Sequence, residues 1–428
     1  MPIHVVSPGE TVASVAKLYG ADERILAFDN DAGNLPALPP GMALQVVVPE
    51  ITHTVKEGET LLSVSQNYGV DPQTLWRNNM FLNGGTAIYP GETLYIRTVR
   101  EPLGVFMTGG YAYPFITAEL LDRSLPFLSA LMPFTYGFTK EGGLIPPNDG
   151  FMIAPCEIYG VSPVMHLSTL DENDVFSVEL AKTLLYGPEL QRKLVDSVIA
   201  NMQSKGYTSL DVDFEFLGAE NAGAYAEFVA YCAGRLHPYG YGVMTALAPK
   251  TSDLQPGALY EGHDYALLGE AADALLLMTY EWGYTYGPPL AVSPIGQVRK
   301  VVDYALTRIP AEKLFLGVSV YGYDFTLPYI KGVSRAESVS ARRALEIAYE
   351  RGAEIKYDAE AQAPYFDYYV GDTRHTVWYE DARSVDARLR LMAEKGLRGA
   401  LIWSLNREGN QNLATFGSLV DRSPFNIL

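Results

Sequence analysis

The residues with the clearest potential for chemistry lie in one short segment, Ser209-Leu-Asp-Val-Asp-Phe-Glu-Phe216. Its pattern predicts a β-strand, in which successive side chains alternate between two faces. Asp211, Asp213 and Glu215 then share one face, with neighbouring Cα atoms roughly 7 Å apart. The other face is apolar and consists of Val212, Phe214 and Phe216. The segment therefore predicts a ladder of three carboxylates on a packed strand.

Such a ladder is costly to bury, because three neighbouring carboxylates cannot all ionise easily in an apolar setting. At least one of them is expected to have a raised pKa. A carboxylic acid that stays protonated near neutral pH beside an ionised one is what acid-catalysed cleavage of a glycosidic bond requires. A calcium site or a solvated strand edge is the alternative interpretation of the same pattern.

The composition limits the classes of protein to consider. The length of 428 residues predicts two or three units, and the 48% hydrophobic and 19% charged content is typical of a soluble globular protein. The net charge of −18 argues against nucleic acids and anionic membranes as partners. We find no apolar run long enough for a membrane span and no conventional signal peptide at the start. Cys156 and Cys232 match no metal or disulfide spacing, so we expect buried thiols.

The first hundred residues contain a repeat, because residues 3–48 match residues 52–97. Each copy has a Gly-Glu-Thr start, a Tyr-Gly stop, an acidic or amide pair ending in Asn, and a Pro-Gly near its end. Each copy is predicted to form strand, helix, helix and strand. Thr11 and Thr60 are expected N-caps, each followed three residues later by Ser rather than the Glu of a capping box. Gly20 and Gly69 are expected to end the first helices.

These motifs resemble LysM modules over the whole length of both copies. The resemblance implies two carbohydrate-binding modules, which we place at residues 1–49 and 50–98. Their ligands would be N-acetylglucosamine-containing glycans such as peptidoglycan or chitin.

The remaining residues, 99–428, alternate apolar runs with amphipathic stretches. Strands are predicted near 103–111, 127–136, 162–169, 209–216, 241–248, 273–280, 313–321 and 398–404, and helices over 187–205, 221–236, 293–307 and 383–395. Eight such units predict an α/β fold, the (β/α)8 TIM barrel, with a doubly wound open sheet as the alternative. Residues 324–375 exceed one crossover and are predicted to form a small α+β insertion beside a cleft, between strands seven and eight.

Several separated motifs in this part resemble the family-18 glycoside hydrolases. They are Leu210–Glu215, Ala246–Lys250, Met278–Glu281, Leu316–Gly322, Val377–Asp381 and Leu401–Trp403. The sequence departs from the family pattern at three positions. Thr208 occupies the place of the first motif Asp, Glu281 replaces an Asp, and Tyr323 occupies the place of a frequent Arg. The first departure leaves the partner of Asp211 open.

The resemblance implies a retaining mechanism in which the substrate's own acetamido group attacks the anomeric carbon. Glu215 would be the acid and then the base, and Asp213 would orient the acetamido group. Asp211 would share a proton with Asp213, and Tyr280 would donate to the acetamido oxygen. The implied substrate-binding residues are Trp403 under the sugar, Glu281, Met278 and Tyr321. Tyr280 or Trp403 as core residues, and Glu281 as a solvated acid, are the alternatives.

Two LysM-like units ahead of such a barrel resemble the N-acetylglucosaminidases that spore-forming bacteria direct at cortex peptidoglycan. We therefore expect a spore location and a monomer. A chitinase and a non-catalytic glycan-binding protein are the alternatives. No metal and no cofactor are expected, since neither ligand spacing nor a Gly-rich phosphate motif is present. His166 is interpreted as a satisfied core histidine.

Overall fold

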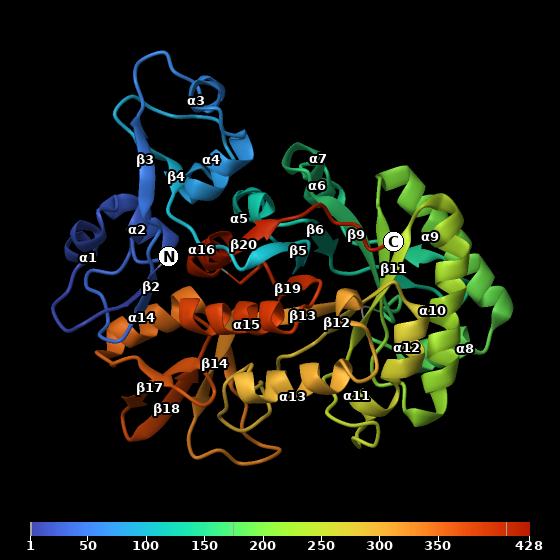
Figure 1. The fold of residues 1–428 in the computed structure, drawn as a ribbon. Coiled ribbons are helices and arrows are strands. Elements are labelled where there is room, and N and C mark those ends of the chain that lie inside the picture. Colours follow the sequence, from blue (N-terminus) through green and yellow to red (C-terminus); the bar gives the residue numbers. More distant parts are fainter. Residues whose placement is uncertain (1, 174, 408) are drawn as a thin grey trace.

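The computed structural model describes residues 2–173, 175–407 and 409–428 (Figure 1). Two small units come first and form one end of the molecule. The first unit comprises β1 (Ile3–Val5), α1 (Val12–Tyr19), α2 (Glu23–Asp29) and β2 (Ala43–Gln45). The second unit comprises β3 (Pro49–Thr54), α3 (Leu61–Tyr68), α4 (Pro72–Asn78) and β4 (Thr93–Thr98). In each unit the two strands pair antiparallel, so the predicted order of elements is confirmed.

Both first helices begin and end with the predicted residues. The Ser14 hydroxyl accepts from the Thr11 N–H at 2.9 Å, and Thr11 Oγ1 accepts from the Ser14 N–H at 3.1 Å. Serine therefore performs the function that Glu has in the usual capping box. Thr60 is capped in the same way. Gly20 ends α1 at φ 66°, a left-handed conformation that glycine adopts without steric cost.

The large domain is a closed barrel of eight parallel strands. They are β5 (Gly104–Ala112), β6 (Ala130–Pro133), β9 (Ser162–Ser168), β10 (Ser209–Asp213), β11 (Gly242–Leu247), β12 (Ala274–Leu277), β13 (Leu314–Ser319) and β19 (Gly399–Trp403). Pairing of β19 with β5 closes the barrel, which excludes the open sheet. A short strand, β20 (Val420–Arg422), adds to the start of β5.

Helices surround the barrel where amphipathic periodicity predicts them. The four predicted helices are α9 (Pro188–Lys205), α10 (Ala222–Leu236), α13 (Ile295–Ala305) and α15 (Ala382–Glu394). The longer of the additional helices are α5 (Ala118–Ser124), α8 (Val178–Leu185), α12 (Tyr265–Ala271) and α16 (Asn410–Leu419), and shorter ones are α6 (Gly150–Ile153), α7 (Cys156–Tyr159) and α11 (Ala258–Glu261). Both cysteines are buried free thiols, as predicted. Within the described residues, we find no helix that combines the length and apolar character needed to cross a bilayer.

The insertion is a five-stranded antiparallel sheet with one helix. Its elements are β14 (Tyr321–Thr326), β15 (Glu337–Ser340), α14 (Ala341–Arg351), β16 (Lys356–Asp358), β17 (Ala363–Val370) and β18 (Thr373–Trp378). The sheet extends beyond the predicted range of 324–375 in the sequence. Its first strand, β14, starts almost directly after the barrel strand β13. The two strands form one continuous apolar run in the sequence, so the prediction assigned Tyr321 to the barrel.

The two small units pack against different partners. The first unit lies against the insertion and the helices α15 and α16, and buried side chains of the unit and the insertion form one apolar cluster. The second unit packs on the barrel near α5 and α7, where the rings of Trp76 and Tyr159 meet at 5.1 Å. Figure 1 shows α3 projecting at the far end from the insertion strands.

Candidate active site

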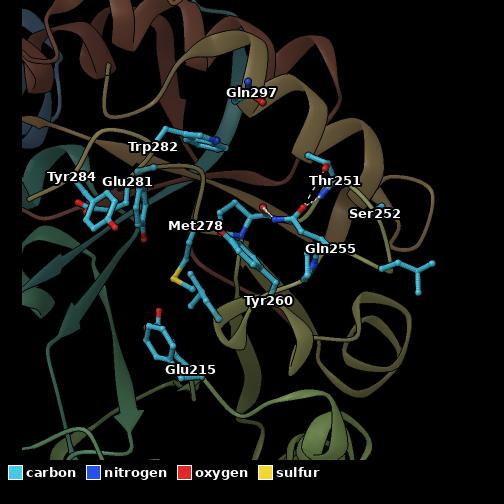
Figure 2. A pocket seen from close by; sticks show the side chains of 16 residues that line it. Glu215, Thr251, Ser252, Gln255, Tyr260, Met278, Glu281, Trp282, Tyr284 and Gln297 are labelled. Atoms are coloured by element: carbon cyan, nitrogen blue, oxygen red, sulfur yellow. Dashed lines mark hydrogen bonds between the residues drawn. The ribbon is translucent and has the colours of Figure 1, made fainter. Parts of the chain in front are cut away.

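The cleft lies at the C-terminal ends of the barrel strands, where active sites of such barrels lie. Its largest cavity, of about 960 Å³, is shown in Figure 2, with Met278 between Glu215 and Trp282. A second cavity, of about 340 Å³, shares Glu215 and Tyr280 with the first. A third cavity, of about 270 Å³, shares Trp403 with the second. Together they form one elongated cleft.

The carboxylates of the opening segment line this cleft. Asp211 lies buried within β10, Asp213 ends the strand, and Glu215 follows in the loop. Asp213 and Glu215 both line the second cavity. Within the described part of the chain, no group hydrogen-bonds the buried Oδ1 atoms of Asp211 and Asp213. These acceptors therefore remain available to a bound substrate or to a shared proton.

Phe216 corrects the prediction for the apolar face of this segment. Val212 and Phe214 are buried, as predicted. Phe216 is instead 51% exposed and lines two of the cavities, so its predicted place on the packing face is wrong. The reason is that β10 ends at Asp213, and Phe216 has a φ of 58°, which turns the chain out of the strand. The alternation of a strand no longer applies beyond that point.

Two carboxyl groups of this segment, those of Glu215 and Asp211, have raised pKa values of different size. Burial, followed by the negative charge of Asp213, raises the pKa of Glu215 to about 8. Burial also raises the pKa of Asp211 to about 6, against the lowering effect of His166. At neutral pH Glu215 is therefore protonated and able to donate a proton, which is the state required of a general acid.

Two partners of Asp211 were not identified from the sequence. Tyr111 on β5 donates its hydroxyl hydrogen to Asp211 Oδ2 at 2.7 Å. His166 on β9 places Nε2 3.8 Å from Asp211 Oδ2 and 3.4 Å from Asp213 Oδ2. Thr208 lies at the other end of β10, exposed, with its hydroxyl bonded to the Pro163 carbonyl. The sequence did not show which residue contacts Asp211, because Thr208 replaces the first Asp of the family motif. The structure shows that Tyr111 and His166 are its neighbours.

The interpretation of His166 as a core histidine is incomplete. Its ring is buried, and Nδ1 lies 2.7 Å from Thr135 Oγ1, as expected of a satisfied histidine. The same ring also lines the second cavity and faces two aspartates. No local sequence pattern identifies this position, because it depends on the parallel register of β9 and β10, in which His166 pairs with Asp211.

Aromatic rings form the base of the cleft around Trp403. The Trp403 ring lies 5.0 Å from Phe134 and 5.6 Å from Tyr111, both edge-on. Tyr280 is nearly parallel to it, with ring centroids 6.4 Å apart. Trp403 is partly exposed to two cavities rather than enclosed in the barrel. Aromatic faces of this kind suit the apolar faces of sugar rings.

Glu281 connects barrel strand β12 to the insertion. Its Oε1 accepts a hydrogen bond from Tyr323 at 2.9 Å and another from Tyr321. Burial raises the pKa of this carboxyl group. Glu281, which occupies the place of a family Asp, thus holds two tyrosines of β14. Glu281 is an exposed residue whose carboxylate is held by two tyrosine hydroxyl groups, and the insertion forms one wall of the cleft through Tyr321 and Tyr323.

The predicted site residues therefore gather in one cleft. They are Glu215, Asp213, Tyr280, Trp403, Glu281, Met278 and Tyr321, with Asp211 directly beneath. Among the residues described by the structure, no cluster of three or more His, Cys, Asp or Glu side chains is arranged to hold a metal ion.

The chain belongs to glycosyl hydrolases family 18, because the model of that family matches residues 173–408. It is therefore a glycoside hydrolase. The LysM domain model matches residues 53–97, and the two matches together indicate a protein that binds glycans.

The chain is also similar to individual proteins and solved structures within this family. The chain is 42% identical over 288 residues to the cortical fragment-lytic enzyme of Bacillus subtilis, covering 67% of each chain. The crystal structure of the spore cortex-lytic enzyme SleL of Bacillus megaterium matches over 99% of both chains, with a TM-score of 0.82 and 32% identity. A chitinase structure from Chromobacterium violaceum matches 73% of this chain and 98% of its own, with a TM-score of 0.68 and 24% identity. That similarity shows the shared fold.

Proposed function

We propose that this protein is a β-N-acetylglucosaminidase that hydrolyses spore cortex peptidoglycan or fragments of it. The observation that carries the proposal is Glu215, which lies in the cleft with a pKa raised to about 8, beside Asp213. Similarity to the cortical fragment-lytic enzyme supports the cortex as the substrate and the spore as the location. The second unit would bind the glycan through its LysM fold.

The proposed mechanism has two steps and retains the configuration of the anomeric carbon. In the first step, Glu215 protonates the glycosidic oxygen while the substrate's acetamido oxygen attacks the anomeric carbon. The bond to the leaving sugar breaks, and an oxazolinium ion forms. In the second step, ionised Glu215 takes a proton from water, which attacks the same carbon and reopens the ring. Asp213 and Glu215 lie on one segment, which favours this scheme over two carboxylates on opposite sides of the sugar.

The surrounding residues have supporting roles in this proposal. Asp213 Oδ1 would accept the acetamido N–H, which holds the acetamido oxygen against the anomeric carbon. Asp211, held by Tyr111, would share a proton with Asp213 as charge develops. Tyr280 would donate to the acetamido oxygen, and Trp403 would support the sugar ring. Met278, Glu281 and Tyr321 would complete the substrate-binding walls.

We also propose the division of the chain at residues 1–49, 50–98 and 99–428. The first unit would be a second LysM module, because it has the same order of elements and the same caps as the matched unit. The insertion is then part of the catalytic domain, since Tyr321 and Tyr323 contribute to its cleft.

Product analysis tests the substrate assignment. Purified cortex fragments and chitin oligomers would be digested in parallel, and the products identified by mass spectrometry. We expect muropeptides with reducing N-acetylglucosamine ends from the cortex fragments. Release of chitooligosaccharides with no action on cortex fragments would instead establish the chitinase alternative. Binding of either glycan without any product would contradict the proposed reaction.

The pH dependence tests the acid. Because Glu215 must carry a proton in the free enzyme, we expect kcat/KM on a soluble substrate to fall above an apparent pKa near 8. The profile should be measured from pH 5 to 10 at constant ionic strength, with unfolding monitored at each pH. A rate that stays constant up to pH 10 would exclude Glu215 as the proton donor.

A further inference from the structure

The two small units can be compared position by position at the loop that leads into their last strand. In the first unit, the Gly41 N–H donates to the Val6 carbonyl at 2.8 Å. In the second unit, the Gly91 N–H donates to the Val55 carbonyl at 2.8 Å. The same backbone bond therefore fixes both loops, and Pro39-Pro40-Gly41 corresponds to Tyr89-Pro90-Gly91. Because the backbone is fixed in the same way, the burial of the two loops can be compared directly.

In the first unit this loop is covered by the rest of the protein. The Ile355 N–H donates to the Pro40 carbonyl at 2.9 Å, and Arg383 Nη2 donates to the Gly41 carbonyl at 3.3 Å. A Cβ atom added at Gly41 would lie 1.8 Å from the Ile355 carbonyl oxygen. Pro39 is buried. The position that corresponds to Tyr89 is therefore buried, and contacts with the insertion and with α15 occupy the backbone carbonyl groups of this loop.

In the second unit the corresponding loop is free. A Cβ atom added at Gly91 meets no atom within 4 Å among the described residues. Tyr89 is 64% exposed, and Pro90 is exposed beside it. The Tyr89 N–H donates to Glu92 Oε2 at 2.8 Å, which fixes the backbone that carries the ring. A large aromatic ring exposed at the surface is suited to stacking on a sugar ring.

The first unit is joined to the catalytic domain by its core as well. Its apolar side chains and those of the insertion form one cluster, which includes Val6, Val15, Leu26, Leu44, Val339, Leu345, Ile355 and Phe366. Polar contacts extend this junction. Asn30 Oδ1 accepts from Gln411 Nε2 at 3.0 Å, and Arg342 pairs with Asp31 at 3.3 Å. The unit thus contacts both the insertion and α16.

We infer that the two units have different functions. The second unit binds glycan through the face that carries Tyr89, by stacking on an N-acetylated pyranose ring. The first unit is a structural clamp between the insertion and the barrel, and it binds no glycan through the corresponding loop. This inference rests on the proposed function only in taking a peptidoglycan as the polymer.

The second unit lies far from the cleft. Figure 1 shows α3 at one end of the molecule and α11 and α13 at the opposite end. Tyr260 of α11 and Gln297 of α13 line the largest cavity of the cleft. A sugar bound by the second unit is therefore not the sugar beside Glu215, but belongs to another strand or a distant stretch of the same strand. The second unit then raises the local concentration of enzyme on a polymer and has no effect on short fragments.

The binding test uses the full chain with Glu215→Gln, so that the glycan stays intact. We expect Tyr89→Ala in this background to weaken binding to insoluble cortex peptidoglycan by about five- to tenfold in a sedimentation assay. Tyr369→Ala is the matched control, because Tyr369 is 62% exposed on the insertion. Equal binding by the Tyr89 and Tyr369 variants would overturn the assignment. This result does not depend on catalysis, so it is separable from failure of the proposed reaction.

With active enzyme, Tyr89→Ala should slow the digestion of insoluble peptidoglycan by a similar factor and leave the rate on soluble fragments unchanged. An equal loss on both substrates would show that the second unit and the cleft hold the same glycan segment, contrary to the inference.

The clamp is tested with a matched pair of glycine substitutions. Gly41→Ala and Gly91→Ala impose a similar backbone cost, since φ is 80° and 91° at the two positions. Gly41→Ala additionally forces Ile355 away. We expect Gly41→Ala to lower the Tm by several degrees more than Gly91→Ala, and to leave glycan binding by the folded protein intact. Equal Tm values for the Gly41→Ala and Gly91→Ala variants would contradict the proposal that the first unit is a structural clamp.

Discussion

Replacing Glu215 with glutamine is expected to lower kcat by about 10²–10⁴-fold, the contribution typical of a positioned general acid and base. Glutamine has nearly the same shape but carries no transferable proton. It can neither protonate the leaving oxygen nor activate the water of the second step. The measurement is the initial rate of reducing-end release from cortex fragments at pH 6, where the pKa of about 8 leaves Glu215 protonated in the wild type.

Stability supplies the control for this variant. The pKa of Glu215 is raised on folding, so as pH rises from about 4.5 the unfolded chain loses this proton while the folded protein keeps it, and the folded state becomes less stable relative to the unfolded state until pH passes about 8. Glutamine cannot ionise and avoids this penalty. We therefore expect Glu215→Gln to be more stable than the wild type at pH 8 and similar to it at pH 4. A variant that is inactive and also less stable at pH 8 would point to misfolding, and a variant with full activity would exclude the mechanism.

Replacing Arg388 with leucine is expected to lower the free energy of unfolding by about 3–5 kcal/mol, the cost of breaking a buried ion pair at one partner. Arg388 and Glu380 are both fully buried, and their closest N and O atoms lie 3.0 Å apart. Arg388 also donates to the Ser384 carbonyl at 2.5 Å and to the Ser293 carbonyl. Without the guanidinium group, Glu380 is a buried carboxylate with no compensating charge.

The pH dependence of this loss identifies its cause. Burial raises the pKa of Glu380 to about 7 even beside Arg388, so in the variant Glu380 escapes the penalty by binding a proton at low pH. Urea unfolding should therefore show a smaller loss at pH 5 than at pH 8. The double variant Arg388→Leu with Glu380→Gln should recover part of the stability. An equal loss at both pH values would indicate that packing, rather than the unpaired charge, dominates.

Local patterns in the sequence were sufficient to predict the elements of this fold. Each βααβ unit has caps and stop signals within its own residues, such as Thr11 and Gly20, and the structure confirms them. The barrel strands are apolar runs separated by amphipathic helices, and their number and order were correct. The sheet of the insertion begins three residues before and ends three residues after the predicted range of about 324–375, because nothing in the residues near Tyr321 marks the end of a barrel strand.

Residue spacing alone predicted only the part of the site that lies on one segment, whereas residues on other segments, such as Tyr280 and Trp403, were predicted from the family resemblance. Asp211, Asp213 and Glu215 are neighbours along the chain, so their spacing was visible in the sequence. Tyr111 and His166 reach the same carboxylates from other strands, and their positions depend on the register of parallel pairing. That register is fixed by packing of the whole barrel and not by residues near either side chain.

The clamp formed by the first unit also affects the order in which the protein can fold during synthesis. The first unit leaves the ribosome before the rest of the chain. Its apolar face, which includes Val6 and Leu44, packs against residues 339–379, and Asn30 contacts Gln411, which lies 381 residues later in the chain. Contacts between such distant parts of a chain form late. Until residues 339–379 have been synthesised, this apolar face therefore lacks the partners that cover it in the folded protein.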